Sequence, residues 1–314
     1  MLEIFNVTTP FFALILCGFL AAKFRLLPEN AVPALNTFVL YFALPCMMVR
    51  FTSQTPFAEL ANLRVFLAYG ASSLVMLGLF VGVARLAAQE PMRDAAYGGL
   101  AASWSNWGYM GFALLPPMLG PASLPILIAA GMADLLVTVS VAIALASLEG
   151  ARGSVRAALA GALRGMARNP LLWAILAGGT LSALEVGLPS AADTLLRLLA
   201  DAAVPVALFT IGVSLYRPGT RGGRTEVMVI TGAKLIAHPY LAALVAAYVF
   251  FLPPLEVRTL ALAAALPVAG TVFLFAERAG ANSERIAASI LASTALAFLT
   301  FSGLCWAFGV SPAR

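Results

Sequence analysis

The stretch Ser-Trp-Ser-Asn-Trp-Gly-Tyr-Met-Gly at residues 103–111 lies in the middle of an apolar run that is long enough to cross a lipid bilayer. A helix in lipid satisfies its own backbone N–H and C=O groups, so residues that loosen it need other partners inside the protein. Two prolines, Pro116 and Pro117, follow near the far end of this run. In the second half of the chain, Leu-Pro-Val-Ala-Gly-Thr at residues 266–271 interrupts another apolar run. Two interrupted runs at corresponding positions of two halves are typical of a transporter binding site.

The composition excludes an ordinary soluble domain. The mean hydropathy is +0.95, 61% of the residues are hydrophobic and only 11% are charged. The net charge of +5 comes from basic residues at predicted membrane edges, not from a basic patch with aromatic residues, so nucleic acid is not an expected partner. There is no HExxH, P-loop or Gly-x-Ser-x-Gly motif and no cluster of metal ligands, so we expect neither an enzyme nor a bound cofactor or metal.

The three cysteines fall inside apolar runs, none is part of a CxxC pair and their number is odd. We interpret Cys17, Cys46 and Cys305 as small core residues, not as a disulfide framework or a zinc site.

We predict an all-α integral membrane protein with about ten transmembrane helices, because the apolar runs approach the ~20 residues needed to span a hydrocarbon core. The predicted spans are residues 8–24, 32–52, 63–86, 93–118, 122–148, 169–187, 193–216, 226–252, 256–279 and 284–309.

The distribution of Lys and Arg predicts the orientation in the membrane. With the N-terminus outside, about 13 basic residues lie in inner loops and about five in outer loops, in line with the excess of Lys and Arg in cytoplasmic loops. The inner set includes Lys23, Arg85, Arg285 and four arginines of the short central loop, residues 151–168. Both termini should therefore lie outside the cell, and the central loop should lie in the cytoplasm.

Five spans on each side of the central loop give the halves 1–150 and 169–314 opposite topology. A weak internal echo agrees with this, since Pro45 in the second span has a counterpart in Pro205 of the seventh. We therefore predict two inverted five-helix repeats, with broken fourth and ninth helices that cross near the bilayer midplane. We see no additional soluble domain.

The two interruptions supply the residues from which we expect a substrate site. Asn106 offers one acceptor and two donors at membrane depth, glycines allow close approach of the backbone, and the ends of half-helices suit an anionic group. The predicted substrate-binding residues are Asn106, Gly108, Gly111, Pro267, Gly270 and Thr271. The alternative is that these glycines and prolines only kink their helices, as they often do in membranes.

Ionisable residues inside predicted spans are costly, at least ~2.5 kcal/mol each at the bilayer centre. Asp134 in the fifth span and Lys234 in the eighth either form a structural ion pair or take part in coupling to a proton or sodium ion. For Asp201 we favour a side chain that reaches the membrane interface. For His238, the only histidine, we favour a helix-packing role, because one His cannot make a metal site.

Three further residues have two interpretations each. Arg50, at the outer end of the second span, either draws anions toward the outer mouth or, as is more common, extends to the lipid headgroups. Trp104 and Trp107 flank the first interruption, although Trp prefers membrane interfaces. They line an aromatic substrate cavity or pack against neighbouring helices.

At these residues the chain resembles a bacterial member of the auxin efflux carrier family, the group that includes malonate-type permeases and is similar to the plant PIN carriers. The resemblance covers nearly the whole length and rests on the order and spacing of several segments. These are Leu44-Pro45, Ser105-Asn106-Trp107-Gly108-Tyr109-Met110-Gly111, Asn169-Pro170, Pro205 to Gly212, Lys234 with His238-Pro239, Ala265-Leu266-Pro267, and Glu284-Arg285 to Leu296.

The resemblance implies a scaffold domain, a transport domain with crossed broken helices, and an elevator-like carrier of organic anions in the bacterial inner membrane. By position, Asn106 matches the family's polar residue at the first crossover and Pro267 matches its proline at the second. Two positions depart from the family pattern. This chain has Ala113 where members usually have proline, and Thr271 where the second crossover often carries Asn.

We therefore predict a secondary active transporter for a small organic anion, such as a mono- or dicarboxylate, that works within the lipid bilayer. A second hypothesis is a sodium- or proton-driven exchanger that moves ions only, and a third is a membrane sensor without transport. The substrate, the coupling ion and a homodimeric state remain open at this level.

Overall fold

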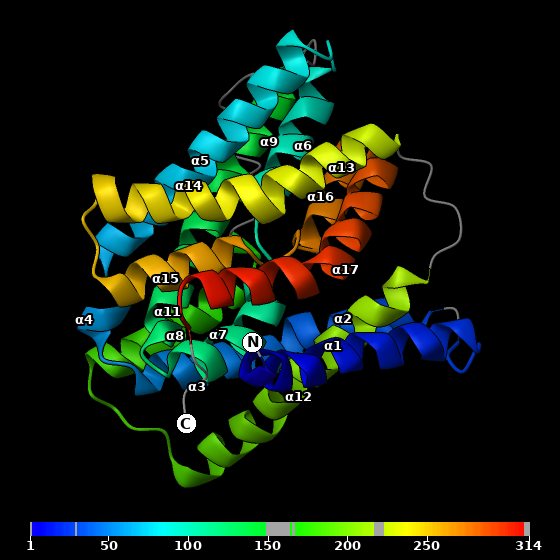
Figure 1. Cartoon of the computed structure of the whole chain (residues 1–314). Coiled ribbons are helices and arrows are strands. Elements are labelled where there is room, and N and C mark those ends of the chain that lie inside the picture. The colour runs from blue at the N-terminus through cyan, green and yellow to red at the C-terminus, as the bar shows by residue number, and fades with distance from the viewer. Residues whose placement is uncertain (1, 29, 149–163, 165–166, 217–222, 311–314) are drawn as a thin grey trace.

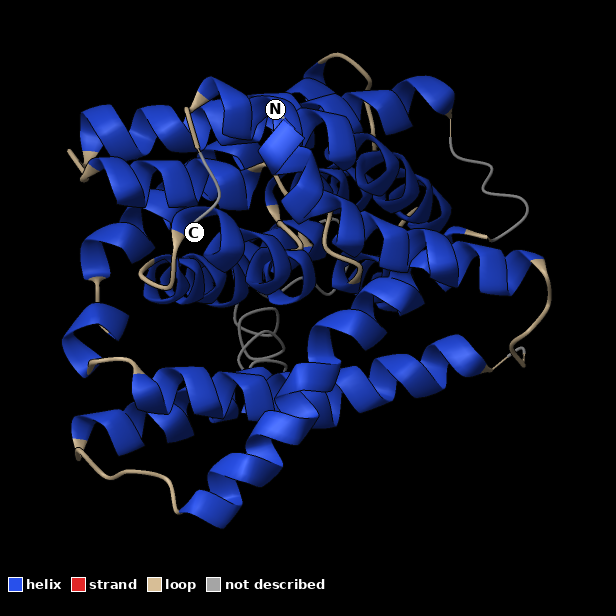
Figure 2. Cartoon of the chain, turned by 60° about the horizontal axis from the view of Figure 1, so that its bottom comes forward, coloured by secondary structure: helices blue, strands red, loops and turns tan. Residues whose placement is uncertain are grey.

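The structure is a computed structural model of the chain, and it describes residues 2–28, 30–148, 164, 167–216 and 223–310. Most of the predicted basic loop, residues 151–168, lies outside these ranges. The described part consists of helices joined by loops, without a strand (Figures 1 and 2).

Before the central loop, the helices follow the predicted spans within a few residues. They are α1 (Leu2–Lys23), α2 (Ala31–Phe38), the π-helical segment η1 (Val39–Ala43), α3 (Leu44–Gln54), α4 (Phe57–Leu60), α5 (Leu63–Leu86), α6 (Met92–Ser103), the π-helical segment η2 (Trp107–Gly111), α7 (Phe112–Leu119), α8 (Ser123–Ala133), the π-helical segment η3 (Asp134–Thr138) and α9 (Val139–Ser147).

After the central loop the same correspondence holds. The helices are α11 (Pro170–Ala183), α12 (Ser190–Leu215), α13 (Arg224–Gly232), the π-helical segment η4 (Ala233–Ala237), α14 (His238–Leu244), the π-helical segment η5 (Val245–Val249), α15 (Pro254–Ala264), α16 (Thr271–Ala279) and α17 (Ser283–Ala307).

Six helical segments in the described part are long and apolar enough to cross a membrane, and two more apolar helices are shorter. The six are Ala31–Gln54, Phe57–Leu86, Ser123–Ser147, Ser190–Ser214, Arg224–Val249 and Ser283–Ala307, and the shorter two are Thr9–Lys23 and Pro170–Ala183. The remaining predicted spans, the fourth and the ninth, are each divided into two helices. The chain is therefore an all-helical, multi-pass membrane protein.

The helices pack in two groups, which Figure 1 shows at the bottom and the top of the view. In the first, called the flank group, α1 packs on α12 and α3 packs on both α11 and α12. In the second, called the crossover group because it contains both interrupted spans, α5 packs on α6 and α8, and α14 packs on α15. Helix α7 contacts α1 of the flank group and α8 and α15 of the crossover group.

Glycines allow the flank helices to approach closely. A Cβ atom on Gly18 of α1 would overlap the carbonyl oxygen of Phe209 on α12, and one on Gly212 of α12 would overlap the carbonyl oxygen of Ile15 on α1. Gly178 of α11 lies in the same way against α3. Small residues at such positions let membrane helices gain van der Waals contact without a hydrophobic driving force.

The half-helices of the interrupted spans are built from small residues. In α6, all residues from Ala95 to Ser103 are buried, and seven of these nine are Ala, Gly or Ser. In α15, Ala261, Ala263 and Ala264 are fully buried. These small side chains allow both half-helices to be enclosed by neighbouring helices, which is a requirement for an irregular backbone at membrane depth.

Contacts between loop residues gather at two ends of the molecule. At one end, the Arg285 guanidinium forms ion pairs with Glu90 at 2.8 Å and Glu226 at 3.4 Å, and Arg93 donates to the carbonyl of Gly280. All five residues belong to loops or helix ends that the sequence predicts on the inner side.

At the other end, Arg50 forms an ion pair with Asp193 at 2.9 Å, and the Ser182 hydroxyl donates to the carbonyl of Thr55. The amide of Asn62 also donates to Glu256, at 3.1 Å. The sequence predicts all of these on the outer side. The loops are therefore sorted as predicted, while the absolute orientation still rests on the bias in basic residues.

The cysteines differ in their environment. Cys305 is buried, as expected of a core residue, and Cys46 is partly buried. Cys17 is exposed, so its interpretation as a core residue is wrong. The reason is that the buried positions of α1, Ile15, Gly18 and Ala21, repeat at helical spacing on one face, and Cys17 lies off that face.

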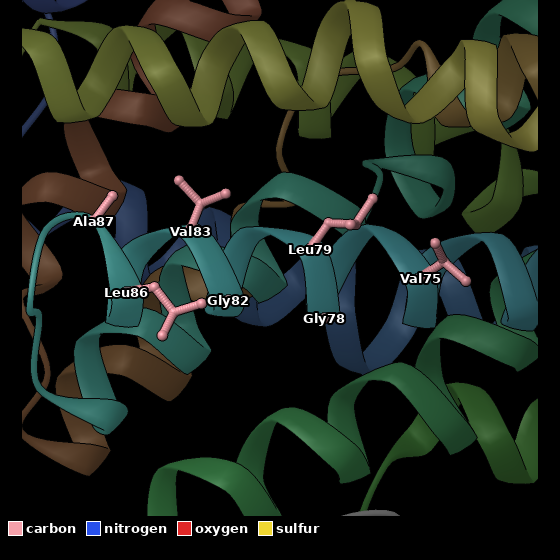
Figure 3. A pocket seen from close by; sticks show the side chains of 7 residues that line it. All are labelled: Val75, Gly78, Leu79, Gly82, Val83, Leu86 and Ala87. Atoms are coloured by element: carbon pink, nitrogen blue, oxygen red, sulfur yellow. The ribbon is translucent and has the colours of Figure 1, made fainter.

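One face of α5 carries a shallow groove that is lined by α5 residues and by Ala87, which directly follows the helix (Figure 3). Val75, Leu79 and Val83 are exposed along it, and a Cβ atom on Gly78 or Gly82 would meet nothing within 4 Å. This apolar face suits contact with lipid, and its glycines differ from those of the flank group in having free space around them.

We expect Gly18→Val to destabilise the protein and Gly78→Val to leave its stability nearly unchanged. The added side chain overlaps the α12 backbone in the first variant and meets open space in the second, and overpacking typically costs about 1–3 kcal/mol. Thermal unfolding of the two purified proteins measures the difference, with helix propensity matched because both sites are glycines within helices. Equal unfolding temperatures would contradict the close packing of α1 on α12.

Candidate functional site

The first interruption lies inside the motif at residues 103–111. Helix α6 ends at Ser103, Trp104 is extended, and a helical backbone resumes at Trp107. Pro116 and Pro117 lie within α7 and do not end it. The chain thus unwinds at residues 104–106, before the prolines.

The second interruption separates α15 from α16. Helix α15 ends at Ala264, and α16 begins at Thr271 with Gly270 before it. Pro267 lies in the irregular segment between them and is buried. Both interruptions predicted from the sequence therefore break their helices completely.

The two breaks meet and pair with each other. The backbone N–H of Asn106 donates to the carbonyl of Pro267 at 2.9 Å, and the N–H of Ala269 donates to the carbonyl of Trp104 at 3.2 Å. Ser105 and Val268 form an isolated antiparallel β-bridge between these bonds. Each break thus satisfies backbone groups of the other that water cannot reach. The pair is called the crossover below.

Several predicted site residues have unused polar groups or free space at the crossover. The side-chain amide of Asn106 makes no hydrogen bond to any described residue, although only 5% of the residue is exposed. Thr271 is partly buried, at the start of α16. A Cβ atom on Gly108 or Gly270 would meet nothing within 4 Å. A ligand can therefore approach the backbone at these two glycines.

The other two predicted residues hold the crossover together. Gly111 packs against Leu127 of α8 and Leu266 of the second break, where a Cβ atom would be crowded. Pro267 is buried and accepts the hydrogen bond from Asn106. Gly111 and Pro267 therefore hold the backbone around the positions with unused polar groups or free space.

Lys234 links the two breaks from η4. Its Nζ atom donates to the hydroxyl of Ser105 in the first break at 2.9 Å and to the carbonyl of Ala264, the last residue of α15. The side chain is fully buried. A cation suits the C-terminal end of a helix, where carbonyl groups point outward with the negative end of the helix dipole.

Asp134 lies at the start of η3 and is also fully buried. Its Oδ1 atom accepts hydrogen bonds from Ser73 at 3.0 Å and Thr138 at 3.3 Å. The backbone N–H of Ser105 faces the same carboxylate, but Oδ2 makes no hydrogen bond. The carboxylate is thus only partly satisfied by hydrogen bonds.

The direct pair between Asp134 and Lys234 that the sequence suggested is not formed, because no carboxylate oxygen lies within 4.0 Å of Nζ. His238 and Ser73 lie between them. Lys234 Nζ lies 3.4 Å from Nδ1 of His238, and Nε2 of His238 lies 3.4 Å from the Ser73 hydroxyl. His238 is therefore part of a polar network and not only a packing residue.

Sequence reasoning missed several members of this network, among them Tyr69 and Ser73. The Tyr69 hydroxyl lies 2.9 Å from the Ser105 hydroxyl and is buried with it. These two residues come from α5, where single polar residues occur in an otherwise apolar helix. Their spacing of four residues, which places them on one helix face, was the available signal.

Trp104 and Trp107 pack against neighbouring helices. Trp104 lies against the ring of Phe275 on α16, with a centroid distance of 5.8 Å. Trp107 lies against Gly131 of α8, where any Cβ atom would overlap its ring. Both are buried, so they support the walls of the crossover.

A half-open cavity of about 260 Å³ lies between α7 and the flank group. It is called the outer cavity below, because Arg50 in its lining belongs to the end of α3 that the sequence predicts on the outer side. The cavity is lined by Phe11, Met47, Arg50, Phe51, Phe112, Ala113, Ala200, Asp201 and Val204. Phe112 and Ala113 directly follow η2, so the cavity borders the first break. Arg50 faces this cavity and pairs with Asp193, while Asp201 is exposed.

Comparison with known proteins agrees with this geometry. The family model described as "Membrane transport protein" matches residues 4–156 and 147–305. The chain is 31% identical to a putative malonate transporter of Rhizobium meliloti (strain 1021), over 98% of this chain and 96% of that protein.

Two more distant relatives have no assigned substrate. The chain is 28% identical to the uncharacterized transporter YfdV of Escherichia coli (strain K12), over 90% of this chain and 91% of the relative. It is 26% identical to an uncharacterized transporter of Methanothermobacter thermautotrophicus, over 91% and 92% of the two chains. The crossed breaks, the family match and these relatives together show that the chain is a membrane transporter of the auxin efflux carrier family.

Proposed function

We propose that the protein is a secondary active transporter that moves a small organic anion across the cell membrane by an elevator-like alternating-access mechanism. The observation that carries this proposal is the crossover, where unused polar groups lie beside two helix starts inside a multi-pass membrane protein. The relative named as a putative malonate transporter agrees with a carboxylate as substrate.

The crossover can bind an anion without a basic residue in direct contact. The first N–H groups of a helix have no partner within that helix, and the positive end of its dipole favours negative charge. Two helical segments begin at the crossover, at Trp107 and at Thr271. The amide of Asn106 and the hydroxyl of Thr271 add donors, and Gly108 and Gly270 leave room for a ligand.

The two helix groups support an elevator-like movement. The crossover group is tied internally at its inner end by Arg285 and at its centre by the paired breaks. The flank group has its own close contacts between α1 and α12 and between α3 and α11. Each of these contacts joins a helix of the first half to a helix of the second half, which is the pattern expected of two inverted repeats.

The polar network favours a proton as the coupling ion. A charged Lys can only donate hydrogen bonds and a carboxylate can only accept them. The hydrogen bonds are therefore oriented from donor to acceptor along one chain, from Lys234 through His238 and Ser73 to Asp134. The nearby ammonium group opposes binding of a sodium ion at Asp134, because like charges repel strongly in a medium of low dielectric constant. A proton can instead move along the hydrogen-bonded groups.

Asn106→Ala should lower carboxylate uptake. Loss of hydrogen bonds to a charged ligand costs roughly 1.5–3 kcal/mol, so we expect the apparent affinity to fall about tenfold or more. Uptake of radiolabelled malonate and butyrate into proteoliposomes measures this. Asn36→Ala is the matched control, since Asn36 is exposed on α2. Unchanged uptake by a folded Asn106→Ala protein would contradict the proposed site. Transport of ions without any carboxylate by the wild type would favour the ion exchanger.

Asp134→Asn should abolish proton-driven accumulation while substrate exchange across the membrane continues. The amide keeps the size of the side chain but cannot carry a proton as the carboxylate does. Uptake is compared under an imposed pH gradient, an imposed sodium gradient, and counterflow without either gradient.

A single variant in this network leaves the other charge buried without compensation, which can cost about 3–5 kcal/mol. The double variant Asp134→Asn/Lys234→Gln removes both charges and keeps the test valid if the single variant unfolds. Accumulation driven by the pH gradient in a folded double variant, or accumulation driven by sodium in the wild type, would contradict proton coupling.

A further inference from the structure

The lining of the outer cavity is mostly apolar but contains two charged residues, and the proposed role of the crossover assigns these two no function. Seven of its nine lining residues are apolar, and three of these are phenylalanines, from α1, α3 and α7. The remaining two are Arg50 from α3 and Asp201 from α12. A cavity with one cation, one anion and aromatic walls can select among carboxylates by both charge and shape.

Arg50 has donors available for a ligand. Its Nε atom is bound to Oδ1 of Asp193 at 2.9 Å, which fixes the guanidinium group in place. The side chain is 24% exposed, and its Nη groups have no hydrogen-bond partner in the part of the chain that the structure describes. The guanidinium fork matches the two oxygens of a carboxylate.

Asp201 works against a second carboxylate. It lines the same cavity from α12 and has no ion-pair or hydrogen-bond partner among the described residues. A dicarboxylate with one end on Arg50 would bring its other end into a space of about 260 Å³ that already contains this carboxylate. Like charges at such short range repel, more so beside apolar walls than in water.

The apolar walls favour a substrate with an apolar body. The rings of Phe51 and Phe112 are stacked with a centroid distance of 5.8 Å, and Phe112 and Ala113 connect the cavity to the first break. Ala113 is also the position where the resemblance leads one to expect proline. Ala113 presents only a methyl group to the cavity at this point.

We propose that the outer cavity is a selectivity site for organic monocarboxylates with an apolar body, in which Arg50 binds the carboxylate and Asp201 excludes a second one. The inference rests on the proposed function, because it assigns the substrate class of the same transporter. It also separates this chain from its relative, whose name refers to a dicarboxylate.

The test compares four probes on the full chain in proteoliposomes: benzoate and isovalerate as monocarboxylates, and malonate and succinate as dicarboxylates. Competition with uptake and ligand-induced thermal stabilisation are measured for each. We expect the wild type to prefer the monocarboxylates. Arg50→Gln should raise the concentration of benzoate needed for half-effect at least about tenfold, and Arg50→Lys should fall between, since Lys lacks the planar fork.

Asp201→Asn should lower the concentration of malonate needed by about tenfold, with a smaller change for benzoate. Arg197→Gln is the matched control. It lies on α12 between Asp193 and Asp201, is exposed, and does not line the cavity, so it should behave as the wild type. A preference of the wild type for malonate, or Arg50→Gln and Asp201→Asn proteins indistinguishable from Arg197→Gln, would overturn the inference.

The outcomes also separate this inference from the proposed function. Absence of any carboxylate transport by the wild type would reject both. Carboxylate transport that is lost in Asn106→Ala but insensitive to Arg50 and Asp201 would reject only the selectivity site. If Arg50→Gln does not fold, the Arg50→Lys and Asp201→Asn proteins still decide the question.

Discussion

The rest of the structure depends on one requirement, that backbone groups at membrane depth find partners inside the protein. Two helices of this chain stop there, and each stop leaves N–H and C=O groups that lipid cannot bind. The two stops satisfy each other through the bonds from Asn106 to Pro267 and from Ala269 to Trp104. Because backbone supplies these bonds, the side chains of Asn106 and Thr271 remain available. The side-chain polar groups of the candidate site are thus unpaired because the two breaks bond to each other through their backbones.

The same requirement explains the position of the buried charges. Lys234 donates to Ser105 in one break and to Ala264 at the end of α15 before the other, so one ammonium group satisfies oxygens from both interrupted spans. A charge at this position is costly unless it is well bonded. Lys234 is therefore the group through which the polar network contacts both interrupted spans. Under the proposed function, ion coupling and substrate binding therefore need no separate long-range connection.

Much of the fold could be predicted from the sequence, because the length of an apolar run and the position of its charges depend on local composition. The helices lie where the runs predicted them, and the pairing of residues 103–111 with residues 266–271 was correctly expected. Of the two alternatives for Asp134 and Lys234, the direct ion pair is not formed, because sequence does not give the distance between side chains of different helices. The role in ion coupling stays a prediction. His238 was undervalued for the same reason. Its partner Ser73 lies on another helix that contacts it only in the folded chain, whereas Lys234 lies one turn away on the same continuous helix, a spacing that the sequence already contains.

Arg50 shows a different limit of sequence reasoning. Its place at the outer end of a span gave two interpretations, and the structure adds the ion pair with Asp193 and a place in the wall of the outer cavity. A side chain that extends freely to the headgroups has no need of an acidic partner on a neighbouring helix. The pair holds the guanidinium beside α12 and the cavity instead. The local sequence of α3 contains nothing that points to residue 193.

The two breaks are alike in their backbone but differ in what surrounds them. In the β-bridge, the N–H of Ser105 faces the Asp134 carboxylate, while the N–H of its partner Val268 donates to the neutral hydroxyl of Ser293 at 3.2 Å. A proton that changes the charge of Asp134 therefore acts directly on the first break and reaches the second only through Lys234 and the bridge. Asn106 also lies in the first break, and the outer cavity borders it. In the proposed function, coupling and selection of the anion are thus concentrated on one side of the crossover, and the second break mainly supplies its frame and the start of α16.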